Sequence, residues 1–358
     1  MTGSLNEGQL IGGRYQILQY IDEGGMQYVY EAYDRLTERN IALKTPKNRS
    51  SMKRFRRSAI VAAKVNHPNV AKTLDYVREG DDRFLIEELV VGQDLSKALL
   101  RRANFLDPYL AARIFHHLAK GVAAAHHAGV IHRDLKPSNV MVSGGYCLDE
   151  VKVTDFGIAK LAQDEIEEAV AGGEASLSMS QTAVGALPYM APEAIDTPKD
   201  VTQAVDIWSV GAMMYHLMTG ATPFGTGLRA VRNILAADKP VPPPFLSRNP
   251  QFAHLSKEVL SLSLACMEKA PAARPTADQL VESCGNLYYN SSSRRFGVVK
   301  RIEFGKWGFI RTEADDVFFH IDSCYGPEPL KQGDHVLFSS FEGGGAQRAY
   351  PVMKLDAI

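Results

Sequence analysis

The hydrophobic period of this chain changes twice, and these changes limit the folds that it can adopt. Between residues 11 and 95 the apolar residues form short runs separated by Gly, Asn, Asp and charged residues. This pattern predicts one helix near 50–65 and strands at 14–21, 28–34, 40–46, 71–79 and 84–90. From residue 107 the apolar residues recur every three or four positions, and beyond 295 this helical period disappears.

The helix-rich middle part has a well-defined start. Asp107 followed by Pro108 is a cap with proline in the first turn, and Gly129 stands at the expected end of the helix. Further helical patterns cover about 203–220, 227–237, 256–267 and 276–286. A strand-rich small lobe followed by a helix-rich large lobe is an α+β arrangement, and ligands often bind in the crevice between two such lobes.

The last part of the chain predicts a small all-β barrel. A polar, serine-containing stretch, NLYYNSSSRR, reads as a linker near 286–295. After it come five strand candidates within about 65 residues, RFGVVKRI, WGFIRT, DVFFHI, HVLFSSF and AYPVMKL. Five short strands bounded by Gly, Pro and Asp are typical of a small barrel.

Composition limits the compartment and the partners. The 40 basic and 41 acidic residues give a net charge of −1, so no global field predicts a nucleic-acid or membrane partner. The start of the chain does not resemble a secretory signal, and no run of 18 apolar residues occurs. We therefore expect a cytoplasmic protein whose scattered cysteines are reduced thiols: Cys147, Cys266, Cys284 and Cys324.

Three short motifs predict the chemistry. HRDLKPSN occupies 132–139, Asp-Phe-Gly follows at 155–157, and Ala-Pro-Glu at 191–193. In this order they resemble the signature set of Hanks-type serine/threonine protein kinases of the bacterial kind, over residues 11–285. The resemblance implies a bilobal kinase that transfers the γ-phosphate of ATP to protein Ser/Thr hydroxyls, with Mg²⁺ or, as a second candidate, Mn²⁺.

The resemblance also implies roles for individual residues. Asp134 would orient the substrate hydroxyl and accept its proton, and Lys136 would touch the transferring phosphate. Asn139 and Asp155 would supply the oxygen ligands that Mg²⁺ prefers. The nucleotide would be lined by Ile21, Gly24, Gly25, Val29, Ala42, Lys44, Glu88 and Val90, with Lys44 on the α- and β-phosphates. Two contacts that support the large lobe are implied as well: a buried ion pair of Glu193 with Arg274, and a brace of the catalytic loop by Asp206.

Four residues depart from the family pattern. Asp22 and Gln27 replace two glycines of the glycine-rich loop, where backbone amides must approach the phosphates closely. Ser58 stands where a helix glutamate would pair with Lys44, and Ala186 replaces a threonine near the catalytic loop. We expect weaker nucleotide binding and slower turnover. A pseudokinase scaffold that binds nucleotide weakly is therefore the alternative.

Glu87 falls at the gatekeeper position, the residue at the back of the nucleotide pocket, which is normally apolar. A buried carboxylate needs a partner. We hypothesise that Glu87 reaches Lys44 and replaces the glutamate missing at Ser58, with a separation below about 6 Å. The alternatives are that Glu87 turns outward or that the alignment slips by one residue.

The segment between Asp155 and Glu193 contains candidate phosphorylation sites. A phosphate there could dock on Arg133, next to the catalytic aspartate, and order the segment. The candidates are Ser176, Ser178, Ser180 and Thr182. Four histidines, His116, His117, His126 and His127, could suggest a metal site, but packed helix residues are the preferred interpretation.

The tail resembles cold-shock domains between about 294 and 354, through KWGFI at 306–310 and DVFFH at 316–320. One residue is missing before Trp307, and Arg301 replaces a usual tryptophan. Period-two alternation puts aromatic side chains on one face with basic residues around them, and the set comprises Lys300, Arg301, Lys306, Trp307, Phe309, Phe318 and His320. Unpaired bases stack on such rings for ~1–3 kcal/mol each, which predicts binding of single-stranded RNA or DNA. The alternatives are that the rings are core, or that the barrel binds protein and inhibits the kinase.

The sequence thus predicts a tail at 1–10, a kinase domain at 11–285, a linker at 286–293 and a cold-shock-like OB-fold domain at 294–358. The expected partners are proteins that carry Ser or Thr, and single-stranded nucleic acid at the tail. No membrane partner is expected, and the oligomeric state stays open.

Overall fold

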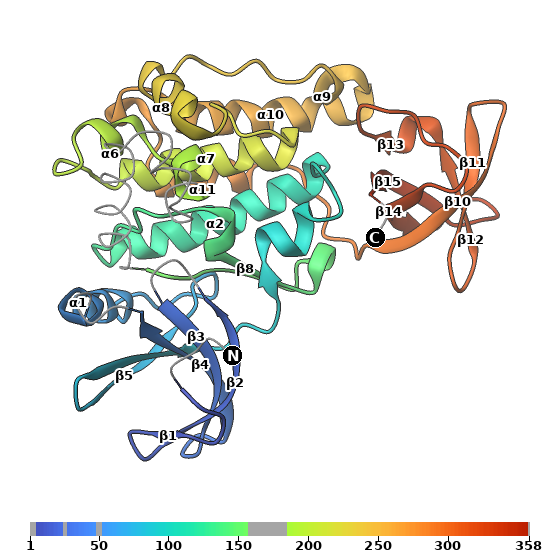
Figure 1. The fold of residues 1–358 in the computed structure, drawn as a ribbon. Coiled ribbons are helices and arrows are strands. Elements are labelled where there is room, and N and C mark those ends of the chain that lie inside the picture. The colour runs from blue at the N-terminus through green and yellow to red at the C-terminus, as the bar shows by residue number, and fades with distance from the viewer. Residues whose placement is uncertain (1–4, 24–26, 48–51, 157–184, 357–358) are drawn as a thin grey trace.

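The computed structural model describes residues 5–23, 27–47, 52–156 and 185–356. They form a small lobe, a large helical lobe and a separate barrel that lies against the large lobe (Figure 1). No helix among these residues is long and apolar enough to cross a membrane.

The small lobe is a six-stranded antiparallel sheet with one helix. Its strands follow the order β1-β2-β3-β4-β6-β5, and the predicted runs are confirmed to within a few residues. The strands are β1 (Leu10–Ile11), β2 (Tyr15–Glu23), β3 (Gln27–Asp34), β4 (Arg39–Pro46), β5 (Thr73–Glu79) and β6 (Asp82–Glu88). One face buries Ile17, Tyr30 and Leu43, and the helix α1 (Met52–Ala62) places Phe55 against Leu85. Alternation of apolar residues along the strands accounts for both faces.

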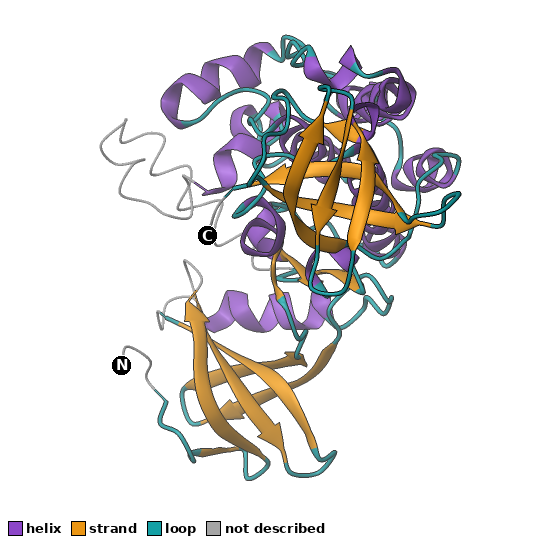
Figure 2. Ribbon diagram, turned by 90° about the vertical axis from the view of Figure 1, so that its right-hand side faces the viewer, coloured by secondary structure: helices purple, strands orange, loops and turns teal. Residues whose placement is uncertain are grey.

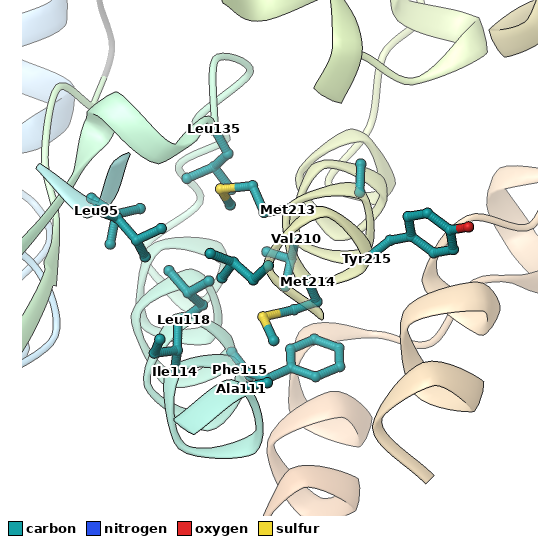
Figure 3. Packing of buried hydrophobic residues seen from close by; sticks show 14 of the residues in the cluster. Leu95, Ala111, Ile114, Phe115, Leu118, Leu135, Val210, Met213, Met214 and Tyr215 are labelled. Atoms are coloured by element: carbon teal, nitrogen blue, oxygen red, sulfur yellow. The ribbon is translucent and has the colours of Figure 1, made fainter. Parts of the chain in front are cut away.

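The large lobe is built around two long helices, α2 (Pro108–His127) and α7 (Ala204–Thr219). Asp107 caps α2 as predicted, since its carboxylate accepts hydrogen bonds from the backbone of Tyr109 and Leu110. Figure 3 shows Phe115 and Leu118 of α2 facing Met214 and Met213 of α7. Helix-spaced apolar residues therefore form the core of this lobe.

The remaining helices complete the large lobe. They are α6 (Pro192–Asp196), α8 (Gly227–Ala236), α9 (Phe245–Arg248), α10 (Pro250–Cys266) and α11 (Ala277–Gly285). The predicted start of α10 near 256 was wrong. The helix begins at Pro250 because the Asn249 side chain accepts a hydrogen bond from the Gln251 amide at 3.0 Å and caps it there.

A short three-stranded sheet lies in the large lobe near its border with the small lobe. It comprises β7 (Gln93–Asp94), β8 (Val140–Ser143) and β9 (Glu150–Val153), in that order. In the β8–β9 hairpin Val140 pairs with Val153. This register sets the residues just before β8 beside those just after β9.

The barrel contains all five strands predicted for it. They are β10 (Arg295–Glu303), β11 (Trp307–Arg311), β12 (Asp316–His320), β14 (His335–Phe341) and β15 (Arg348–Leu355), with a short β13 (Cys324–Tyr325) at one edge. A β12–β15 pairing closes the sheet. The barrel faces the viewer in Figure 2. Gly308 must be glycine, because a Cβ there would lie 2.3 Å from the carbonyl oxygen of Arg301.

The barrel packs directly on the large lobe. Tyr325, Leu337 and Met353 belong to the same buried cluster as the large-lobe core. The ring of Tyr350 stacks on Phe252 of α10, with centroids 5.3 Å apart. Arg294 forms a buried ion pair with Asp107 at 2.9 Å, directly at the start of α2.

The segment 286–293 between the two parts also contacts the large lobe. Leu287 is buried, and the Tyr289 hydroxyl lies 2.7 Å from the His116 ring nitrogen. The polar composition predicts a linker; within it Leu287 and Tyr289 pack on the large-lobe core, whereas Tyr288 is 84% exposed.

Candidate functional site

Lys44 lies at the centre of a buried charge cluster. It sits on β4, directly opposite Val29 on β3, and two residues after Ala42, whose partner on β6 is Glu87. The Lys44 Nζ lies 2.6 Å from Glu87 Oε2 and 2.8 Å from Asp155 Oδ1. The predicted contact between Glu87 and Lys44 is therefore confirmed.

Two carboxylates thus share one ammonium in a site almost closed to water. Burial opposes the charge of Lys44, but Asp155 and Glu87 together raise its pKa above the usual value. Burial raises the pKa of Glu87, and the attraction of Lys44 only partly offsets this. Although burial acts on Asp155 in the same direction, Lys44 and a hydrogen bond from Gln27 lower its pKa.

The catalytic loop is held by the buried Asp206, as predicted. Its carboxylate accepts hydrogen bonds from the backbone of His132 and Arg133, both at 2.8 Å, and lies 2.9 Å from the His126 ring. Arg133 has a positive φ of 67°, a conformation that is costly without glycine. The two hydrogen bonds that Asp206 accepts stabilise this turn and so orient Asp134.

The β8–β9 hairpin brings the two predicted metal ligands to one place. Asn139 precedes β8 and Asp155 follows β9, and the Thr154 amide donates to the Asn139 carbonyl at 2.9 Å. Asp155 also has a positive φ of 63°, and the next residue, Phe156, packs on the His132 ring with centroids 4.6 Å apart.

Asp134, Lys136 and Asn139 form a second polar cluster beside the first. Lys136 Nζ lies 2.9 Å from Asp134 Oδ2. The Asn139 amide nitrogen donates to the Asp134 backbone carbonyl at 2.8 Å and to its carboxylate at 3.1 Å. Because the nitrogen is used in these bonds, the amide oxygen is the atom that Asn139 can offer to a cation.

The glycine-rich loop departs from the expectation in a way that sequence reasoning missed. Gln27 was expected to obstruct the phosphates. It is instead buried, and its Nε2 donates to Asp155 Oδ1 at 2.7 Å, while its Oε1 has no hydrogen-bond partner among the residues that the structure describes. Asp22 forms an ion pair with Lys97 of the large lobe at 3.0 Å, so part of its charge is neutralised. Gly24 and Gly25 lie outside the described residues.

The remaining predicted nucleotide contacts lie on strands β2, β3, β4 and β6 of the small lobe and just after β6. Ala42 and Val90 are buried, whereas Ile21 is 45% exposed. The Glu88 side chain pairs with Lys152 and accepts a hydrogen bond from the Lys72 amide. The pairing fixes the chain where it passes from the small to the large lobe.

Several other predicted residues have clear surroundings. Arg274 donates to Glu193 at 2.8 Å, which confirms that ion pair, and Ala186 is buried. The Ser58 side chain lies outside those that the structure describes, as do the candidate phosphorylation sites Ser176, Ser178, Ser180 and Thr182.

The four histidines each contact a different side chain and do not converge. His116 contacts Tyr289, His117 contacts Asn69, His126 contacts Asp206, and His127 contacts Asp278. His126 is buried, and His116 and His117 are partly buried, whereas His127 is exposed, so the prediction of packed helix residues does not hold for His127.

The outer face of the barrel carries three clustered rings, which we call the aromatic platform: Trp307, Phe309 and Phe318. Their centroids lie 5.9 to 6.1 Å apart. The residues that alternate with them, Ile310 and Phe319, are fully buried. The alternative that all these aromatics are core is therefore wrong for the three platform rings, which are partly exposed.

Cationic groups surround the platform. Arg301 lies over the Phe309 ring at 5.0 Å and Arg348, which the sequence analysis missed, over the Phe318 ring at 5.9 Å. Lys300 pairs with Asp316, and the exposed His320 and Lys306 flank the edge. The exposed ring of Phe304 extends the platform beyond Trp307.

Comparison with known proteins finds relatives for the first three-quarters of the chain. The family model of the protein kinase domain matches residues 15–284. A probable serine/threonine-protein kinase of Clostridium perfringens is 32% identical over 284 residues, which is 76% of this chain and 38% of the relative. The serine/threonine-protein kinase pkn3 of Myxococcus xanthus is 34% identical over 75% of this chain and 49% of its own length.

A third relative is the serine/threonine-protein kinase PknA of Mycobacterium tuberculosis, 32% identical over 66% of this chain and 54% of the relative. The chain thus spans about a third to a half of the length of these relatives. Among solved structures, Rad53 residues 1–466 in complex with AMP-PNP matches with a TM-score of 0.57 at 22% identity, over 75% of this chain and 64% of that one. This last likeness concerns the fold.

Proposed function

Because the chain belongs to the protein kinase family, we propose that it transfers the γ-phosphate of ATP to Ser and Thr hydroxyls of protein substrates. The observation that supports this best is the meeting of Lys44 from the small lobe with Asp155 from the large lobe, at 2.8 Å. Asp134 and Lys136 lie together on the loop that Asp206 braces. A phosphoryl transfer needs these elements: a positioned hydroxyl, an acceptor for its proton and cations on the phosphates.

The residues fit a magnesium–nucleotide complex. Asp155 and the amide oxygen of Asn139 would hold the metal, which neutralises the charge on the phosphate oxygens when bound. Lys44 would hold the α- and β-phosphates, and Glu87 keeps its amine in place from the neighbouring strand. Asp134 would orient the hydroxyl and take its proton, and Lys136 would contact the transferred phosphate. Ile21, Val29, Ala42, Glu88 and Val90, with Gly24 and Gly25, would line the nucleotide.

The test is incorporation of labelled phosphate from ATP by the purified chain, with itself and a generic Ser/Thr protein as acceptors, beside the variant Asp134→Asn. We expect incorporation to fall by at least about 100-fold in this variant, since general-base contributions are of that order. Equal incorporation in both proteins would refute the proposal. Nucleotide binding without incorporation would instead favour the pseudokinase scaffold.

We also propose that the barrel is a cold-shock-like domain that binds single-stranded RNA or DNA on the aromatic platform. The three partly exposed rings at stacking distance from one another support this, with Lys300, Arg301, Lys306 and His320 around them. The barrel can be tested through Trp307, because the second tryptophan, Trp208, is fully buried in the large lobe. Titration with oligothymidine should quench Trp307 fluorescence, and an unchanged signal would refute the proposal.

The division into a kinase domain at 11–285, a linker at 286–293 and a barrel domain at 294–358 remains our prediction. We further propose that a phosphate on Ser176, Ser178, Ser180 or Thr182 docks on the exposed Arg133 guanidinium. Mass spectrometry of the active chain after incubation with ATP would test this, and absence of phosphate on all four residues would refute it.

A further inference from the structure

A cavity of about 320 Å³ lies where the barrel meets the large lobe. We call it the seam pocket. Arg102 is the one large-lobe residue in its lining, and the barrel supplies the others, among them Phe296, Val298, Arg311, Glu313 and His335. The pocket therefore depends on both parts of the molecule.

Arg102 lacks the partners that a guanidinium normally has. Its Nε is buried without a hydrogen-bond partner, and within the described residues its guanidinium forms no ion pair. It lies over the Phe296 ring at 5.4 Å, and Phe296 is 51% exposed. A half-buried guanidinium beside an accessible ring is suited to a planar, anionic ligand, since arginine binds phosphate and stacks on aromatic surfaces.

The seam pocket and the aromatic platform share one face of β11. Arg311 lines the pocket and lies two residues after Phe309 on β11, so both side chains leave the same face of that strand. On the neighbouring strand its partner is Val298, which also lines the pocket. From Trp307 to Arg311 this face extends about 13 Å.

The distribution of charge also favours an anionic ligand that extends from the platform to the seam pocket. Around the platform Lys300 and Arg301 are already paired with Asp316 and Glu303. Arg311 is exposed and, among the described residues, forms no ion pair. Among the described residues that line the pocket, Glu313 is the one carboxylate, against two arginines.

The outer face of strands β14 and β15 is covered by the large lobe. Leu337, Met353 and Leu355 are buried within the large-lobe cluster. A strand lying on the platform and continuing along β11 past Phe309 consequently meets the seam pocket at the border of this covered face.

We propose that the seam pocket is a second nucleotide subsite, built jointly by the large lobe and the barrel, for a single strand that extends beyond the aromatic platform. The base stacks on Phe296, and Arg102 and Arg311 bind the adjoining phosphates. This inference rests on the proposed binding of nucleic acid by the barrel, and it adds a large-lobe residue to that function.

The experiment measures binding of labelled oligothymidines of about four and about twelve nucleotides to the full chain by fluorescence anisotropy, over a range of salt. Arg102→Gln is compared with Arg101→Gln, which removes the same charge from the adjacent, exposed residue outside the pocket. Trp307→Ala reports on the platform, and Arg311→Gln approaches the pocket from the barrel. Thermal unfolding checks that each variant is folded.

We expect Arg102→Gln to weaken binding of the long oligonucleotide about tenfold, as for one charged hydrogen bond, and to leave the short one unchanged. In Arg102→Gln the slope of log K against log salt concentration for the long oligonucleotide should decrease in magnitude by about 0.7. Arg311→Gln should act alike, and Arg101→Gln should have no effect.

The outcomes separate the two proposals. Binding that is lost in Trp307→Ala but equal in Arg102→Gln and Arg101→Gln would overturn the seam pocket and leave the platform standing. If neither oligonucleotide binds the unmodified chain, both proposals fail. Equal weakening of the short and the long strand by Arg102→Gln would also overturn the seam pocket, because a distal subsite cannot reach the short one.

Discussion

Replacing Glu87 with methionine tests whether this gatekeeper carboxylate positions Lys44. In the structure it is the small-lobe partner of Lys44, at 2.6 Å, and both side chains are buried. The other partner, Asp155, would turn to the metal when the nucleotide binds, and Lys44 would then depend on Glu87. We therefore expect Glu87→Met to impair the nucleotide-bound enzyme more than the free protein.

The magnitude follows from the geometry. An ion pair at 4 Å is worth about 4 kcal/mol at an effective dielectric of 20 before desolvation is subtracted. Desolvation removes part of this, so about 2–3 kcal/mol of transition-state stabilisation should be lost. This corresponds to a fall in kcat/KM of roughly 30- to 150-fold. Global stability should change little or rise, because methionine replaces a buried charge.

The assay is steady-state phosphorylation with labelled ATP, together with the Kd of a fluorescent ATP analogue and the Tm of each variant. Glu31→Gln is the control, since Glu31 bonds Gln19 and Asn40 in exposed positions of the same sheet. The double variant Ser58→Glu with Glu87→Met should recover part of the activity, because it returns a glutamate to α1. A kcat/KM within twofold of the unmodified protein in Glu87→Met would refute the reasoning.

Three further predictions follow from buried contacts. Gln27→Gly frees Asp155 from a hydrogen bond at 2.7 Å and should lower the Mg²⁺ concentration for half-maximal incorporation about fivefold, and an equal or higher requirement would contradict this. Burial lowers the pKa of His117 from 6.5 to about 4, so the unfolded chain binds a proton that the folded chain does not, and stability should fall as pH decreases through that window. Because His117 is partly exposed, we expect the free energy of unfolding to fall by about 1–2 kcal/mol over this pH range. The fall should be smaller in His117→Gln, and an identical pH dependence of thermal unfolding in both proteins would contradict the prediction. Arg294→Met leaves Asp107 buried without its ionic partner and should lower the free energy of unfolding in urea by about 3–5 kcal/mol. The double variant Asp107→Asn with Arg294→Met should lose less than the sum of the two single losses, and additive losses would argue against coupling.

The regular elements could be predicted because they depend on local periodicity. The longer strands of the small lobe and of the barrel alternate apolar and polar residues, and each predicted run lies within a few positions of its strand, whereas the two-residue strands β1 and β13 were not predicted. The cap at Asp107 set the start of α2 correctly. The start of α10 was missed because the cap at Asn249 precedes the strongest apolar repeat, and capping and periodicity are separate signals.

Contacts between distant segments were harder to predict. The pairing of Lys44 with Glu87 could be inferred because both lie at motif positions on adjacent strands. The hydrogen bond from Gln27 to Asp155 joins residues 128 positions apart in different lobes, and no local pattern predicts it. A signal was nevertheless present, since a glutamine in place of a loop glycine must find a polar partner when it is buried.

The contact of the barrel with the large lobe could likewise not be predicted from the sequence. Alternation predicts the face of β15 on which Tyr350 lies, but it does not say which surface covers that side chain, and the short strand β13 that carries Tyr325 was not predicted. The covering surface is Phe252 of α10, together with Tyr109 of α2, whose hydroxyl lies 2.7 Å from that of Tyr350.

The ion pair of Arg294 with Asp107 determines how the tail can act on other molecules. A flexible tether would let the barrel sweep a wide volume and would lower the effective concentration of anything that it carries. Here the barrel is joined to the start of α2 by this buried ion pair and packs on the large lobe. If the barrel binds a nucleic-acid strand as proposed, a protein bound to the same strand would reach the kinase site from a limited set of positions, and its distance from the platform along that strand would decide whether it is phosphorylated.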